Sequence, residues 1–128
     1  MTEASARTYD ILVVDDEAEV RSLLSDLLAA EGYAVHTAAD GDDAIGVLER
    51  RAFDLILLDI KMPLIGGFEV LKFVREKHPR TRVIMLTAFA ELANAMESKI
   101  LGADDFVGKP FNPDELLMSI ERSLKLIG

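Results

Sequence analysis

Short, unbroken apolar runs alternate along this chain with longer stretches in which apolar residues recur at helical spacing. Four such runs predict β-strands: Ile11–Val14, Leu55–Leu58, Val83–Leu86 and Phe106-Val107. Val35–Ala38 predicts a further, weaker strand, the second along the chain. Runs without polar alternation are typical of strands that are covered on both faces. The pattern therefore indicates a buried, parallel sheet.

The stretches between the runs predict five helices. The first carries Val20, Leu23, Leu24, Leu27 and Leu28 at the i, i+3, i+4, i+7, i+8 positions of one helical face. The other four are a short helix capped by Asp40, helices over Phe68–Lys77 and Leu92–Leu101, and a last helix capped by Asn112 with Pro113 in its first turn. Their expected buried residues are Ala44, Ile45 and Leu48, then Val70, Leu71 and Val74, and finally Leu116, Leu117, Ile120 and Leu124. Leu92, Met96 and Ile100 form a stripe on the fourth helix that is core at least in part.

Five strand–helix units predict an α/β fold of the doubly wound type, because right-handed crossovers place helices on both faces of a parallel sheet. The length of 128 residues suits one domain with one core. We expect residues 1–9 to form a flexible polar tail and residues 10–128 to form the domain.

Composition narrows the range of partners. The chain has no cysteine, which excludes disulfides and thiolate metal sites. Its formal net charge is -9, with the acidic excess in the first 60 residues, so we expect no direct binding to nucleic acid. No apolar run approaches the ~20 residues of a membrane span. Lys72, Arg75, Lys77, Arg80 and Arg82 form a basic cluster that we interpret as a solvated face.

Polar residues stand where four of the five predicted strands end. Asp15 and Asp16 follow the first strand, Asp59 the third, Thr87 the fourth and Lys109 the fifth. Ligands of open α/β sheets bind beyond the carboxyl ends of the strands. Each residue alone would be an ordinary cap or loop residue, but four strands agree on one edge.

This set of groups suits phosphoryl transfer. Converging carboxylates repel one another unless a cation joins them, and hard oxygen ligands favour Mg²⁺, or Mn²⁺. Lys109 and Thr87 can bind phosphoryl oxygens, as a point charge and as a hydroxyl donor. A carboxylate such as Asp59 can attack phosphorus to give an acyl phosphate.

Five segments of the chain resemble the signature segments of response regulator receiver domains of two-component systems. They are Ile11–Glu17, Leu57–Pro63, Leu86–Ala88, Gly102–Phe106 and Lys109–Phe111, and the match runs from about Asp10 to Leu124. The resemblance implies a flavodoxin-like, five-stranded sheet in the order 2-1-3-4-5 with five helices. Flavodoxin and the chemotaxis response regulator are standard examples of that order, so it comes from the resemblance and not from the spacing.

The resemblance also implies a role for each site residue. Asp59 would accept the phosphoryl group of a sensor histidine kinase or phosphotransfer protein. Asp16, Asp59 and the backbone carbonyl of Lys61 would bind Mg²⁺ directly, Asp15 would bind it mainly through water, and Lys109 would bind the phosphoryl group.

Phosphorylation would then act as a switch. Thr87 would move toward the phosphoryl group, the ring of Phe106 would turn inward, and the Lys109-Pro110 peptide would be cis, which proline permits. The face made by the fourth helix, fifth strand and fifth helix would change and control a downstream protein or effector domain. The implied module is cytoplasmic and not an enzyme in the usual sense, because it catalyses only its own phosphorylation and dephosphorylation. A phosphorylation-linked homodimer is a further hypothesis.

Some positions depart from the usual pattern of the family. Gly66 stands where an acidic or small polar residue is common, so we expect a looser loop. Phe106 lacks the hydroxyl of the tyrosine often found there, which puts any switching through that hydroxyl in doubt. Lys61 and Phe89 occupy positions that influence the lifetime of the phosphoryl group.

Other functions fit the sequence less well. An aspartyl phosphatase normally has a second aspartate two residues after the nucleophile, where this chain has Lys61. A flavin or dinucleotide site would need a glycine-rich loop where Asp15–Glu17 stand. A receiver-like interaction module that never takes phosphate is the remaining alternative. The sequence leaves open whether the domain stands alone or is the front part of a longer regulator.

Overall fold

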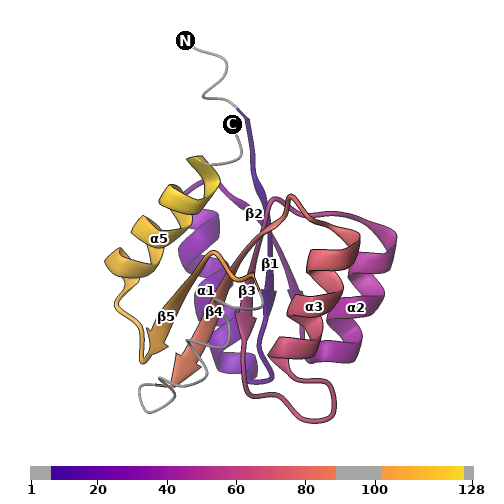
Figure 1. The fold of residues 1–128 in the computed structure, drawn as a ribbon. Helices are drawn as coiled ribbons and strands as arrows, with labels where there is room; N and C mark the ends of the chain where they lie inside the picture. The colour runs from indigo at the N-terminus through magenta and orange to yellow at the C-terminus, as the bar shows by residue number, and fades with distance from the viewer. Residues whose placement is uncertain (1–6, 89–101, 126–128) are drawn as a thin grey trace.

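The computed structural model describes residues 7–88 and 102–125, apart from the side chains of Thr87 and Ala88. Five parallel strands form one sheet in the order β2-β1-β3-β4-β5, which confirms the expected α/β fold (Figure 1). The strands are β1 (Asp10–Val14), β2 (Ala34–Ala38), β3 (Leu55–Asp59), β4 (Arg82–Ala88) and β5 (Asp105–Lys109).

Helices cover both faces of this sheet (Figure 1). Helices α1 (Ala18–Ala30) and α5 (Pro113–Lys125) lie on one face, and α2 (Gly41–Arg50) and α3 (Gly67–Lys77) lie on the other. The fifth predicted helix, Leu92–Leu101, falls outside the described residues. None of the described helices combines the length and the apolar character needed to cross a lipid bilayer.

Successive side chains of each central strand point to opposite faces of the sheet and feed two separate cores. In β1, Ile11 and Val13 pack with α1 and α5, whereas Leu12 and Val14 pack with α2 and α3. All four residues are fully buried. This double coverage is why the strands read as unbroken apolar runs.

Two of the predicted helix starts are fixed by side-chain caps. The Asp40 carboxylate accepts a hydrogen bond from the backbone N–H of Asp43 at 2.8 Å, at the start of α2. The amide oxygen of Asn112 accepts bonds from the backbone N–H groups of Asp114 and Glu115, at the start of α5. Each cap pairs donors that the first helical turn would otherwise leave open.

The stripe predicted for α1 is correct except at one position. Leu24 and Leu28 are fully buried, and Val20 and Leu27 pack partly against the same core. Leu23 is 58% exposed. It stands about 100° around the helix from Leu24, at the edge of the stripe that meets the sheet.

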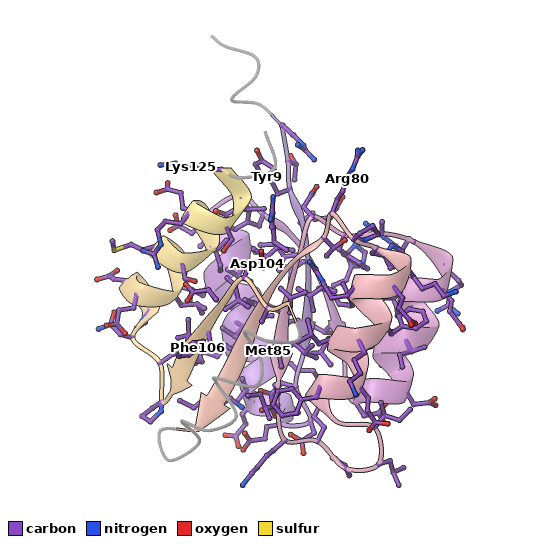
Figure 2. The ribbon with its side chains drawn as sticks, viewed as in Figure 1. Tyr9, Arg80, Met85, Asp104, Phe106 and Lys125 are labelled. Atoms are coloured by element: carbon purple, nitrogen blue, oxygen red, sulfur yellow. The ribbon has the colours of Figure 1, made fainter. Side chains whose placement is uncertain are left out.

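The basic cluster is not wholly a solvated face, which corrects the expectation for two of its members. Arg82 pairs with Asp104 at 3.2 Å, just before β5 (Figure 2). Arg75 donates to the backbone oxygen of Thr81, and burial lowers the pKa of its guanidinium although the charge of Asp104 opposes this. Arg75 therefore reaches the start of β4 and Arg82 the residue before β5, and both side chains are partly buried.

Residues just before β1 contact the fold, although the sequence analysis assigns them to the tail. Tyr9 packs partly against the core under α1 and α5, and its backbone oxygen accepts a bond from Ala34 (Figure 2). Arg7 pairs with Asp54 at 2.7 Å and lies over the ring of Tyr9. Contacts with the rest of the domain therefore include Arg7 and Tyr9, which precede β1.

Candidate functional site

The carboxyl ends of β1, β3 and β5 bring together groups that are far apart in the sequence. The Lys109 Nζ lies 2.7 Å from Asp15 Oδ2 and 3.5 Å from Asp59 Oδ1. A third carboxylate, that of Glu17, lies 3.7 Å from the same ammonium. The Asp15 side chain is fully buried and that of Asp59 is nearly so. One lysine thus ties the acidic groups of two strands together.

A cluster of carboxylates follows β1 directly. Oxygens of Asp15, Asp16 and Glu17 lie within 4.8 Å of one another, and the side chains of Asp16 and Glu17 are exposed. Such a set of hard oxygen ligands, open to solvent on one side, fits a divalent cation of the Mg²⁺ type. The backbone N–H of Glu17 donates to Asp15 Oδ1, and Arg21 donates to the Asp15 backbone oxygen at 2.8 Å. The first bond holds the buried carboxylate of Asp15 and the second holds its backbone.

The environment of Asp59 raises its pKa to about 6. Burial is the largest cause and the negative charge of Asp15 is the next, with a smaller contribution from Asp16. Lys109 and a hydrogen bond from the backbone N–H of Lys61 act in the opposite direction. The carboxyl group therefore holds its negative charge less readily than an ordinary aspartate.

Lys109 remains a cation at the centre of this site. Burial alone would lower the pKa of its ammonium group. The hydrogen bond to Asp15 and the charges of Asp59, Asp15 and Glu17 outweigh that effect and raise the pKa. A permanently charged lysine beside a buried carboxylate is suited to binding an anionic group that arrives there.

Glycines let the loop after Asp59 pass close to the strands. A Cβ on Gly67 would meet the backbone oxygen of Asp59 and lie 2.8 Å from Ile60 Cα. The Gly67 N–H donates to the Ile60 oxygen at 3.0 Å, and Glu69 accepts a bond from the Gly66 N–H at 3.2 Å. These contacts hold the loop at Gly66, where the sequence analysis expects it to be looser.

The remaining predicted residues are placed in part. Thr87 stands opposite Gly108 in the pairing of β4 with β5, but its side chain is not among those described, and Phe89 lies outside the described residues. Phe106 pairs with Met85 across the strands and packs partly against the core under α2 and α3 (Figure 2). The Lys109-Pro110 peptide bond is cis.

Two residues that contact the site have no role predicted from the sequence. Glu17 is the third carboxylate of the acidic cluster, and Arg21 holds the backbone of Asp15. The adjacent Asp-Asp-Glu run was a usable signal for Glu17. No pattern singles out Arg21. Its bond to the backbone of Asp15 depends on how the start of α1 is placed relative to the end of β1.

Comparison with known proteins identifies the class of molecule. The family model of the response regulator receiver domain matches residues 11–121. The chain therefore belongs to the response regulator receiver domain family. It is the receiver domain of a two-component response regulator, a signalling module and not a conventional enzyme.

Relatives and solved structures agree with this family. The chain is 45% identical over 115 residues to the transcriptional regulatory protein ResD of Bacillus subtilis, covering 90% of this chain and 48% of ResD. It is 42% identical to the regulatory protein AtoC of Escherichia coli, covering 91% of this chain and 25% of AtoC. The chemotaxis protein CheY4 of Vibrio cholerae superimposes with a TM-score of 0.85 at 37% identity, over 91% of this chain and 99% of that one. The chain thus spans half or less of these two curated regulators and nearly all of CheY4.

Proposed function

We propose that Asp59 accepts a phosphoryl group from the phosphohistidine of a sensor histidine kinase or phosphotransfer protein, with Mg²⁺ as cofactor. The observation that carries the proposal is the position of the Asp59 carboxylate. It is nearly buried, faces the Lys109 ammonium at 3.5 Å, and shares that lysine with the acidic cluster. Phosphoryl transfer depends chiefly on positioning and charge neutralisation, and both are present here.

The chain's own groups have distinct parts in the transfer. The Asp59 carboxylate attacks phosphorus, an O–P bond forms as the N–P bond to the donor imidazole breaks, and the imidazole takes up a proton from solvent. Lys109 exchanges its bond to Asp15 for one to a phosphoryl oxygen, and the Thr87 hydroxyl donates to another. Asp15, Asp16, Asp59 and the backbone carbonyl of Lys61 would hold Mg²⁺. When bound, the ion neutralises the carboxylates and the phosphoryl oxygens; Mn²⁺ has the same preference for oxygen ligands.

The phosphoryl group then alters the surface around β5. Thr87 moves toward it, and the ring of Phe106, now half-buried, turns further inward. A surface cavity of about 350 Å³, lined by residues of β5 and α5 that include Phe106, borders the region that would change. A downstream protein or an effector domain binds this face. A second copy of the chain is a further partner that phosphorylation would favour. The net charge of -9 argues for protein partners over nucleic acid. As a separate part of the proposal, we assign the domain to the cytoplasm.

Two residues beside the acceptor set the lifetime of the phosphoryl group. The backbone of Lys61 bonds to Asp59 and its side chain is exposed, so that the side chain stands where water approaches. Phe89 takes the corresponding position after Thr87. Lys61→Ala and Phe89→Ala should change the rate of dephosphorylation at least about twofold, measured as loss of the phosphoryl adduct after the donor is removed. Unchanged decay in both variants would refute the assignment.

A small acyl-phosphate donor tests the proposed function directly. Acetyl phosphate with Mg²⁺ should give a phosphoryl adduct by intact mass, and EDTA or Asp59→Asn should abolish it. Beryllofluoride should produce matching spectral changes in the wild type only. Absence of any adduct in the wild type would favour an interaction module that never takes phosphate, and turnover of external phosphoesters would indicate a true enzyme.

A further inference from the structure

The loop between β3 and α3 forms a short closed projection beside the acceptor. Its base is fixed where the Gly67 N–H bonds to the Ile60 oxygen at 3.0 Å and the Ile60 N–H bonds to Leu86 of β4 at 3.1 Å. Both bonds lie next to Asp59 at the end of β3. A partner that contacts the tip of this loop is therefore held in a defined position relative to Asp59.

Two apolar residues of the loop face inward and one faces outward. Met62 and Ile65 pack partly against the core under α2 and α3. Ile65 also meets the start of α2, where a Cβ on Gly41 would lie 2.8 Å from Ile65 Cβ. Leu64, between them, is 99% exposed. Packing within the domain therefore gives no reason for a leucine at this position.

The backbone gives no reason either. Leu64 follows Pro63 and has φ 66°, in the left-handed region. A proline followed by a residue with positive φ is a turn that favours glycine or asparagine at the second of the two positions. A bulky side chain is disfavoured in that conformation. Residues held in such backbone conformations concentrate at functional sites, so an outlier of this kind is a reason to look for a contact outside the domain.

Leu64 lies close to the area that a protein acting on Asp59 would cover. Leu64 is five positions after Asp59, which limits the distance between their Cα atoms to about 18 Å, and the return of the loop to Ile60 shortens it. An ordinary interface buries about 800 Å² on each partner, a patch of roughly 16 Å radius. A small acyl phosphate occupies only the centre of that patch and has no need of the loop tip.

We propose that Leu64 is an apolar anchor for the protein that delivers the phosphoryl group to Asp59. The inference rests on the proposed function. The side chain seats in an apolar recess on the donor, next to the phosphohistidine. Exposed carboxylates of Asp16 and Glu17 on the same edge of the sheet favour basic groups around that recess. Leu64 acts on association with the donor and takes no part in the chemistry at Asp59.

Substitutions at Leu64 separate docking from chemistry. Leu64→Gly and Leu64→Asn remove the anchor and suit the positive φ, so the denaturation midpoint should stay the same or rise. Their kcat/KM for transfer from a radiolabelled histidine kinase core should fall roughly tenfold, mainly through KM, as for a typical interface anchor. A panel of histidine kinase cores is screened first, and the core that phosphorylates the wild type fastest is used. Phosphorylation by acetyl phosphate should be unchanged.

Two controls test the chemistry that the anchor requires. Leu64→Met keeps an apolar side chain at the loop tip and should retain most of the transfer. Met118→Asn removes another exposed apolar side chain, on α5, and should leave transfer unchanged.

Several results would overturn the inference while leaving the proposed function intact. The first is a kcat/KM with the kinase core that stays within twofold of wild type in Leu64→Gly and Leu64→Asn. The second is an equal loss of rate in these variants when acetyl phosphate is the donor. The third is a wild type that reacts with acetyl phosphate but with none of the kinase cores. Loss of self-association in these variants, with transfer unchanged, would assign Leu64 to contact between copies of the chain. Failure of the wild type to react with acetyl phosphate would instead count against the proposed function.

Discussion

Asp59 carries its negative charge at an energetic cost, because it is nearly buried and lies near Asp15. Its pKa of about 6 compares with 3.8 for an ordinary aspartate. At 1.36 kcal/mol for each pKa unit, keeping the group ionised at neutral pH costs the metal-free protein about 3 kcal/mol. Between these two pKa values the folded protein holds a proton that the unfolded chain has lost. Stability therefore falls as pH rises through that window.

Asp59→Asn removes this cost and should stabilise the metal-free domain. At pH 7 we expect the free energy of unfolding to rise by about 1–3 kcal/mol, with the full cost of the charge as the upper limit. Below about pH 3 the wild-type carboxyl is largely protonated in both states, so the difference should nearly vanish. Urea denaturation of both proteins at the two pH values measures this. A gain of the same size at both values would show that the charge of Asp59 is not the cause.

Lys109 should matter for stability as well as for its proposed role in binding the phosphoryl group, because it is the cation paired with the fully buried Asp15. Lys109→Ala leaves that carboxylate without its partner and should destabilise the metal-free domain by about 3 kcal/mol at pH 7. Lys125→Ala is a matched control, because Lys125 faces Glu121 at 4.0 Å on the surface. It should cost at most about 0.5 kcal/mol. Similar losses in both variants would contradict the assigned role of Lys109.

At the scale of elements, α3 stands close to β3 only because its first residue has no side chain. The Gly67 position lies against the backbone of Asp59 and Ile60. Gly46, in the middle of α2, has open space around it. The two helical glycines therefore have opposite consequences when a methyl group is added.

Gly67→Ala should displace the end of β3 and cost about 2–3 kcal/mol, in the range of overpacked sites. It should also slow phosphorylation by acetyl phosphate, because the displaced backbone carries Asp59. Gly46→Ala should stabilise the domain by about 0.5–1 kcal/mol through helix propensity alone. Thermal or urea denaturation and adduct formation by mass spectrometry measure these effects. If Gly67→Ala changed neither stability nor adduct formation, the backbone would have to move away from the added methyl group at the point where the structure shows contact.

The hydrophobic pattern predicted β1, β3 and β4 most clearly, because a strand covered on both faces has no polar alternation to confuse it. It also located the edge strand β2, although His36 and Thr37 in its middle are exposed. For β5 the apolar pattern covers only Phe106-Val107. The strand runs over Asp105–Lys109, because its pairing with β4 continues through Gly108 and Lys109, which are not apolar residues. The pattern also treated Arg82 as solvated. Its partner, Asp104, lies far along the chain, so the local sequence gives no signal of the pair.

The strand-end rule found the centre of the site but not its surroundings. Asp59 and Lys109 could be predicted to approach each other because parallel strands end at one edge, whatever their separation in sequence. The role of Arg21 and the positive φ of Leu64 depend on how loops and first helical turns close, and residue type alone does not encode this. Sequence thus predicts which strand ends carry the chemistry, and the loops supply the contacts around it.

At the scale of the whole molecule, the fold collects negative charge at one edge of the sheet, so cation binding and folding stability are linked. At ten times its dissociation constant, Mg²⁺ should raise the free energy of unfolding by about 1.4 kcal/mol, because the unfolded chain does not hold the carboxylates together. NaCl of the same ionic strength should give a smaller rise, since it only screens the charges. Asp16→Asn should remove most of the Mg²⁺ effect and leave the NaCl effect in place. Urea denaturation under the three conditions measures both terms, and equal stabilisation by the two salts would mean that this edge holds no specific cation.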